Sequence, residues 1–117
     1  MTGLSDILHA LAARPGVDAA VLVSPDGLPI QQAGAIALDA DALAALAATA
    51  VRHASRLVEG AELGGWHTLL LEAEGGTLIL SAAGAGNVLL LLVAADAAFG
   101  DLLYDLRRDR PTLGALL

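Results

Sequence analysis

Apolar residues recur along this chain with two spacings, one helical and one extended, which together predict three helices and five strands. The i, i+3, i+4, i+7 spacing of Leu4, Ile7, Leu8 and Leu11 predicts a short amphipathic helix, and Pro15 ends it. Shorter apolar runs between turn residues predict strands at residues 19–23, 28–33, 66–73, 77–82 and 88–94.

A last helix is expected after residue 94. Asp96 is its predicted N-cap, and Arg107 and Arg108 lie in its last turn. Its apolar positions are Phe99, Leu102, Leu103 and Leu106. Because Pro111 cannot continue a helix in the usual way, we expect a single domain over residues 1–110 and a short tail at 111–117.

The longest predicted element is an alanine-rich helix of about six turns over residues 39–60. Asp39 is its expected N-cap and Gly60 its expected stop. At 100° per residue, one broad apolar face, which should cover a sheet, contains Leu43, Leu46, Ala47, Ala50, Val51, Ala54, Leu57 and Val58. The opposite face contains Asp41, Ala45, Ala48, Thr49, Arg52, Arg56 and Glu59.

The first half of that opposite face is mostly methyl groups, whereas a helix facing only water more usually carries Lys and Glu. We interpret it as an interface, most readily with a second copy of the chain. The competing interpretation is that alanine was used simply for its helix propensity.

Two of the predicted strands, residues 19–23 and 88–94, are apolar on both faces. Such strands sit centrally in a sheet with cover above and below. Pro29 lacks an amide donor and Glu72 and Glu74 share one strand face, so their strands should lie at the two edges. The hairpins then predict an α+β domain with a five-stranded antiparallel sheet in the order 2-1-5-4-3. The long helix should cover one face and the two short helices the other.

Composition narrows the function. The 117 residues are 56% hydrophobic and 16% charged, and so few charges suggest that a partner covers part of the surface. A net charge of −7 argues against nucleic acid and anionic membrane as targets. The chain has no cysteine, and its N-terminus lacks a secretory pattern. The uncharged stretch at 75–95 is broken by turn residues into two strand-length runs, which argues against membrane insertion and predicts a cytoplasmic protein.

No pattern of catalytic, cofactor-binding or metal-binding residues stands out. The chain contains no lysine for a phosphate-binding loop, and Gly84-Ala85-Gly86 matches turn glycines better. The three histidines lie on different predicted elements, and Ser81 has no nucleophile-elbow motif around it. Arg52 and Arg56 could act as an arginine finger on a nucleotide of a partner, but a solvated or dimer-bridging arginine pair is more common. We expect this pair to take part in docking rather than in catalysis.

Several motifs in order give the chain a family resemblance. Pro15-Gly16-Val17 leads into the strand at 20–23, Asp26-Gly27-Leu28-Pro29-Ile30 follows, and the alanine-rich helix precedes strands at 69–71, 78–80 and 89–93. The chain therefore resembles a roadblock (dynein light-chain) domain of the bacterial kind that includes co-regulators of Ras-like GTPases. The likeness covers residues 4 to about 106.

The resemblance implies a profilin-like three-layer fold and a dimer in which the central helices pack side by side and the third strands pair. It also implies a platform for a small Ras-like GTPase with no catalytic centre of its own. In the gliding-motility type, two copies contact one GTPase through the central helix. Carried over by position, that surface is Ala45, Ala48, Thr49, Arg52, His53, Arg56 and Glu59. The expected dimer interface is Ala44, Ala48 and Ser55 with Thr68, Leu70 and Glu72 of the third strand.

Three functional hypotheses follow. The first is a homodimeric module that binds and regulates a Ras-like GTPase. The second is a structural adaptor in a signalling or motility complex, with no effect on GTP turnover. The third and weakest is a small-ligand sensor, which would need an enclosed pocket between helix and sheet where the strands supply mostly leucine.

Overall fold

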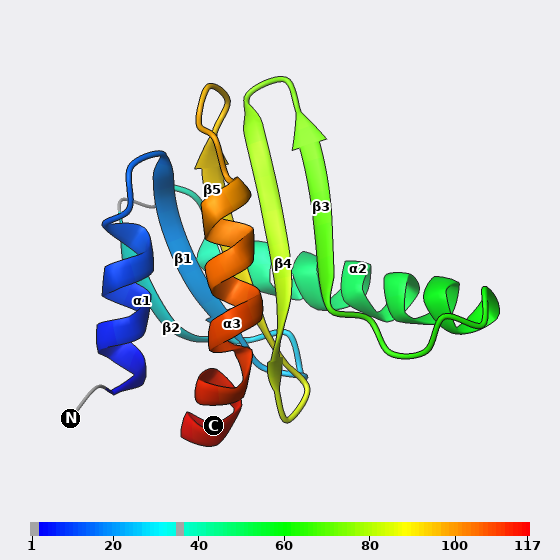
Figure 1. Ribbon diagram of the computed structural model, residues 1–117. Helices are drawn as coiled ribbons and strands as arrows, with labels where there is room; N and C mark the ends of the chain where they lie inside the picture. The colour runs from blue at the N-terminus through cyan, green and yellow to red at the C-terminus, as the bar shows by residue number, and fades with distance from the viewer. Residues whose placement is uncertain (1–2, 35–36) are drawn as a thin grey trace.

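The computed structural model describes residues 3–34 and 37–117 of the chain (Figure 1). The helices are α1 (Leu4–Ala12), α2 (Ala40–Gly60) and α3 (Gly100–Leu116). The strands are β1 (Val17–Val23), β2 (Pro29–Gly34), β3 (Thr68–Ala73), β4 (Gly76–Gly84) and β5 (Asn87–Ala94).

The strands form an antiparallel sheet in the order β2-β1-β5-β4-β3, which confirms the predicted fold. The two strands that are apolar on both faces, β1 and β5, pair with each other at the centre, with Val21 opposite Leu90. Figure 1 shows α1 and α3 on one face of the sheet and α2 on the other. The chain therefore has three layers, in which each face of the sheet is covered by helix.

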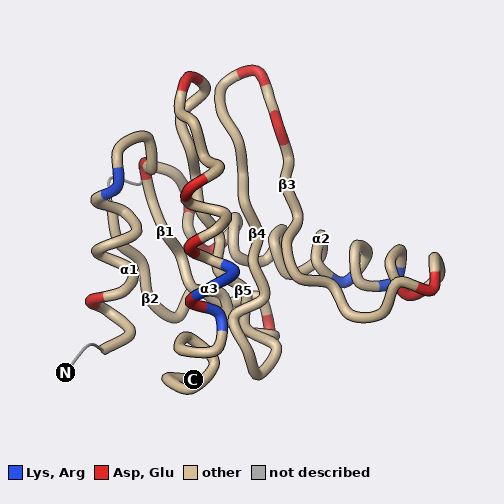
Figure 2. The backbone as a smooth tube through the Cα atoms, viewed as in Figure 1, with Lys and Arg blue, Asp and Glu red and all other residues tan. Residues whose placement is uncertain are grey.

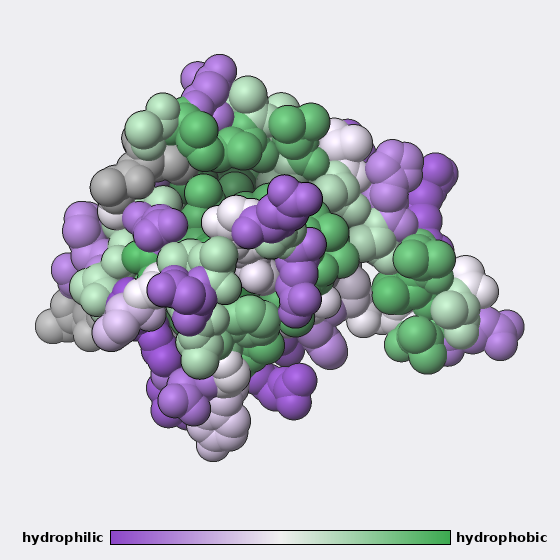
Figure 3. Space-filling view, turned by 90° about the horizontal axis from the view of Figure 1, so that it is seen from above, coloured by the Kyte–Doolittle hydropathy of each residue, from purple (hydrophilic) through white to green (hydrophobic). Residues whose placement is uncertain are grey.

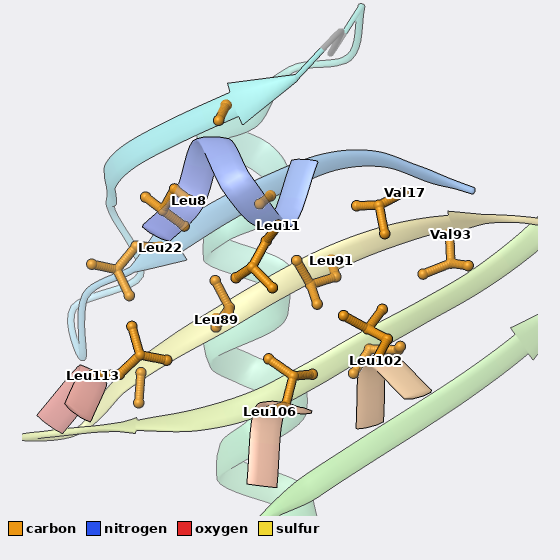
Figure 4. Close-up of a cluster of buried hydrophobic side chains, with 14 residues drawn as sticks. Leu8, Leu11, Val17, Leu22, Leu89, Leu91, Val93, Leu102, Leu106 and Leu113 are labelled. Atoms are coloured by element: carbon orange, nitrogen blue, oxygen red, sulfur yellow. The ribbon is translucent and has the colours of Figure 1, made fainter. Parts of the chain in front are cut away.

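The α1/α3 face holds the larger hydrophobic core. Leu8 and Leu11 of α1 and Leu102, Leu106 and Leu113 of α3 meet the sheet side chains there (Figure 4). The sheet contributes Val17, Ala20, Leu22, Ala33, Ile79, Ala83, Leu89, Leu91 and Val93. Leu106 follows Leu102 by four residues and Leu113 follows Leu106 by seven, so the three leucines share one side of α3 and the helix lies along the sheet.

Helix α3 differs from its predicted form. It begins after Phe99 rather than at Asp96, and it continues through Pro111 to Leu116 instead of ending at Arg108. The predicted tail at 111–117 is therefore wrong as secondary structure. Proline costs the helix one hydrogen bond, but Leu113 in the following turn is buried and holds that turn on the sheet. The approach is close, since a Cβ on Gly84 would lie 2.8 Å from the Cα of Gly114.

Helix α2 begins as predicted, with Asp39 accepting a hydrogen bond from the amide of Ala42 at 3.2 Å. Its first half crosses the sheet face formed by Val21, Val23, Leu80, Val88 and Leu90. The helix ends one residue later than expected, because Gly60 is still helical and Ala61 is the C-cap.

The β1–β2 turn fits under α2 because of a glycine. Gly27 has a φ of +82° and donates to the carbonyl of Ser24 at 2.9 Å, as expected of a turn glycine. A Cβ at this position would lie 3.3 Å from the Cα of Ala45 and 3.4 Å from the Cβ of Ala48. The small residues on both sides therefore let the helix backbone approach the turn.

Among the helices of the described residues, none is long and apolar enough to cross a bilayer.

Candidate protein-interaction site

The second half of α2 extends past β3, the edge strand, and away from the body of the molecule (Figure 1). The buried residues of α2, Ala44, Ala47 and Ala48, all lie in its first half. Leu46 and Leu57, which were predicted to face the sheet, are 66% and 74% exposed. That prediction was wrong for both leucines. Leu57 lies in the half of the helix that extends past the sheet, and Leu46 lies on the flank of the half that crosses it.

Leu46 and Leu57 belong to an apolar stripe along one flank of α2, completed by the half-buried Leu43 and Ala50. A narrow groove separates the first half of this stripe from the sheet. Its residues are Leu43, Leu46, Ala47 and Ala50 of α2 and Leu71, Leu78, Leu80 and Leu90 of the strands. Figure 3 shows apolar side chains gathered on the projecting end of the molecule. Leu63, just after α2, is also 73% exposed.

Strand β3 continues this exposed surface. Within the described ranges it pairs with β4 only, so its other edge presents free amide and carbonyl groups. Leu70 is 38% exposed and Leu71 is 45% exposed. Thr68, Leu70 and Glu72, the predicted dimer residues of this strand, alternate along it and are all exposed, on the same face of the sheet as α1 and α3.

The outer face of α2 carries the residues expected to meet a partner. Ala45, Thr49, Arg52, His53, Arg56 and Glu59 are all exposed. Thr49 donates to the carbonyl of Ala45 at 3.0 Å, and Arg52 donates through Nη2 to the hydroxyl of Thr49 at 3.1 Å. Within the described part of the chain, neither Arg52 nor Arg56 forms an ion pair. Their charges are therefore available to groups outside the chain.

Two residues expected on the interaction surface lie elsewhere. Ala44 is fully buried against the sheet, and Ala48 is 6% exposed beneath the Gly27 turn. The placement of Ala44 and Ala48 on an outer surface is therefore wrong, and their methyl groups serve the close packing of α2 within the chain. Ser55 is half-buried on the inner side of the projecting half.

The apolar stripe is the part of the surface that sequence reasoning missed. The helical spacing of Leu43, Leu46, Ala50 and Leu57 was visible, but it was merged with the sheet-facing positions. The length of the helix relative to the width of the sheet could have indicated an overhang, because a helix of 21 residues spans about 32 Å. Five antiparallel strands about 4.8 Å apart span only about 19 Å between the axes of the outer strands.

On the α1/α3 face of the sheet, an ion pair joins the two helices. Arg14, at the end of α1, donates to the carboxylate of Asp105 on α3, and Arg108 lies 3.3 Å from the same carboxylate. The hydrogen bond from Arg14 is the main reason that the pKa of Asp105 is lowered, and the charge of Arg108 adds to it. Figure 2 shows that α3 carries both acidic and basic residues. In the described residues, no cluster of His, Cys, Asp or Glu is suited to hold a metal ion.

Fold and surface together define a class of protein: a small α+β domain with an overhanging helix and a free edge strand, both suited to contacts with other chains. The Roadblock/LC7 domain family model matches residues 4–94, and the chain belongs to this family.

Solved structures agree with the fold. A Roadblock/LC7 domain from Streptomyces avermitilis is 28% identical, with a TM-score of 0.81 over 96% of this chain and 98% of that one. Myxococcus xanthus MglB is 18% identical, with a TM-score of 0.87 over 96% and 92%. The gliding protein MglB from Thermus thermophilus is 18% identical, with a TM-score of 0.82 over 99% and 93%. A search of curated proteins found no match.

Proposed function

We propose that this protein is a non-catalytic, homodimeric module that binds and regulates a Ras-like small GTPase through the outer face of α2. The observation that carries the proposal is the uncovered surface along α2. The helix presents an apolar stripe on one flank and, on the other, arginines without acidic partners among the described residues. Two unlike surfaces on one element suit two different contacts. The resemblance to MglB-type domains supplies the GTPase as the partner.

The apolar stripe is assigned to a second copy of the chain. Leu46, Leu57, Leu70 and Leu71 are large apolar side chains in water, and the free edge of β3 is a template for strand pairing. A symmetric antiparallel pairing centred on Leu70 places Glu72 of one copy opposite Thr68 of the other, so the two glutamates do not face each other. The projecting half of α2 then lies over the sheet of the second copy.

The charged face is assigned to the GTPase. Arg52 is pre-oriented by its hydrogen bond to Thr49, which lowers the entropy lost when its guanidinium binds a carboxylate. Arg56 lies one turn further along the same face, and His53 lies beside it. Arginine pairs of this kind bind carboxylates with bidentate geometry, which gives specificity for an acidic surface.

The decisive experiment measures GTP hydrolysis by the cognate GTPase, identified from the neighbouring genes, with and without this protein. We expect turnover or nucleotide release to change in a concentration-dependent way. If light scattering shows a complex but GTP turnover and nucleotide release are unchanged, the protein is a structural adaptor instead. The absence of any complex would contradict both functions.

Docking and catalysis by the arginines are separated by charge-conserving variants. Arg52→Lys with Arg56→Lys keeps the positive charge but removes the guanidinium fork. If the arginines only dock the partner, we expect the maximal effect on turnover to persist at a higher protein concentration. If one of the arginines acts as an arginine finger, the double variant should instead reduce stimulated GTP hydrolysis about a thousandfold, even at saturating protein. Arg107→Glu, on the exposed side of α3, is the matched control and should leave docking unchanged.

A further inference from the structure

A hollow of about 690 Å³ lies beside the second half of α2, between that helix and the β4–β5 turn of the same chain. It is on the flank of α2 away from the groove that the apolar stripe lines. Its walls come from three parts of the chain that are distant in sequence. They are Val51, Arg52, His53, Ser55 and Arg56 of α2, Trp66 before β3, and Ala82, Gly84, Gly86 and Asn87 of the turn region.

The charge of this hollow is opposite to that of the molecule. The chain has 13 acidic residues and a net charge of −7, yet no carboxylate of the described residues lines the hollow. Two of the six arginines of the chain line the hollow, together with an imidazole and a serine hydroxyl. Arg52 is held by the hydroxyl of Thr49. The polar part of the hollow is therefore complementary to anions.

The rest of the wall is apolar and aromatic. Trp66, the one tryptophan of the chain, packs against the α2 core and remains half-buried where it meets the hollow. Val51 and Ala82 extend this surface. A ligand that matches both parts carries negative charge beside an apolar group.

The hollow is too open for a small molecule to be enclosed. None of its lining residues is fully buried, and Arg52, His53, Arg56 and Gly86 are exposed. Small-molecule sites usually bury most of the surface of their ligand. A segment of a protein needs no such enclosure, because the remainder of its chain makes further contacts outside.

We propose that this hollow receives an extended acidic segment of a protein partner, with carboxylates on Arg52 and Arg56 and an apolar side chain against Trp66. The inference deepens the proposed function and rests on it for the identity of the partner, because Arg52, His53 and Arg56 belong to both surfaces. It adds that the partner offers a chain segment and not only a flat face.

The single tryptophan provides the test, since its indole N–H gives one resolved signal in a nitrogen–proton NMR spectrum. The probe is a capped peptide of four glutamates around one leucine, with the glutamine version as its uncharged control. We expect the acidic peptide to shift the indole signal saturably. We also expect added salt to weaken the binding of the acidic peptide several-fold more than it weakens any binding of the control peptide. An unmoved indole, or equal shifts from both peptides, would overturn the proposal.

Variants locate the contact. Arg52→Gln with Arg56→Gln should weaken peptide binding at least tenfold, whereas Arg107→Gln should leave it unchanged. Equal losses from both would show non-specific charge attraction and overturn the site. Equal shifts produced by free glutamate would overturn the extended-segment form of the proposal.

Two outcomes separate this inference from its alternatives. If the double glutamine variant loses its dimer mass in light scattering, the occupant is the second copy, and the inference fails. If the peptide binds at Trp66 while the GTPase forms no complex, the hollow stands and the proposed function fails. If the GTPase is regulated equally by wild type and the double variant, the function stands without this site.

Discussion

The two faces of the sheet are covered to different extents. On the α1/α3 face, two helices lie along the sheet, and Leu8, Leu102, Leu106 and Leu113 are buried at 3% exposure or less. On the α2 face, one helix crosses the sheet, and the buried residues it contributes are alanines. Large apolar side chains of that helix, Leu46 and Leu57, remain in water.

The difference separates residues that hold the fold from residues left for other molecules. The closed face satisfies its apolar side chains within the chain, so it explains stability. The open face leaves an apolar flank, a charged flank and a strand edge without partners among the described residues. Uncovered surfaces of this kind are typical of interfaces.

The largest predicted effect is on the closed face. Leu106→Ala removes a side chain that is 3% exposed between α3 and the sheet. We expect the free energy of unfolding to fall by about 2–5 kcal/mol, measured by urea denaturation at a fixed protein concentration. Leu116→Ala, in the same helix but at a position that is 41% exposed, should change it by less than about 0.5 kcal/mol. Similar losses from both would mean that α3 does not lie on the sheet as described.

The next prediction concerns the open face. Leu57→Asp places a charge in the apolar stripe, where each copy would otherwise bury a leucine worth about 1.5–3 kcal/mol. We expect the dimer to dissociate at micromolar concentration, seen as a single-chain mass in light scattering, with an unchanged circular dichroism spectrum. Glu59→Gln, two residues away on the charged side, is the control and should remain dimeric. A two-chain mass for the Leu57 variant would move the dimer interface off this stripe.

The sequence predicted the sheet well because its signals are local or depend on simple burial. Val21 and Leu90 lie in runs that are apolar on both faces, so central positions for β1 and β5 followed directly. The edge position of β2 followed from Pro29, which lacks an amide donor. These arguments need no knowledge of helix positions.

The interaction surface was predicted less well, because it depends on where α2 stops covering the sheet. Helical spacing says which residues share a flank, but not how far along the flank a sheet extends beneath it. Leu57 was placed on the wrong face for this reason, since it projects into water. Ala48 was placed on an outer face because the spacing does not show that the Gly27 turn covers it. The continuation of α3 beyond Pro111 was missed because it is held by a tertiary contact of Leu113.

The smallest predicted effect tests how the closed face is fastened. Arg14 donates to Asp105 and so joins the end of α1 to α3, which keeps the pKa of Asp105 below its ordinary value. A carboxyl whose folded pKa is lowered stabilises the fold above its unfolded pKa of about 3.9 and loses that contribution as pH falls through the folded pKa. The Asp105→Asn variant should therefore have a lower melting temperature than the wild type at pH 7. This gap in melting temperature should close at pH values below the folded pKa. Asp101→Asn, exposed one turn earlier on α3, should show no such pH-dependent gap. A gap that persists unchanged in acid would mean that the loss comes from packing, and the closed face would then be held by its leucines without help from the ion pair.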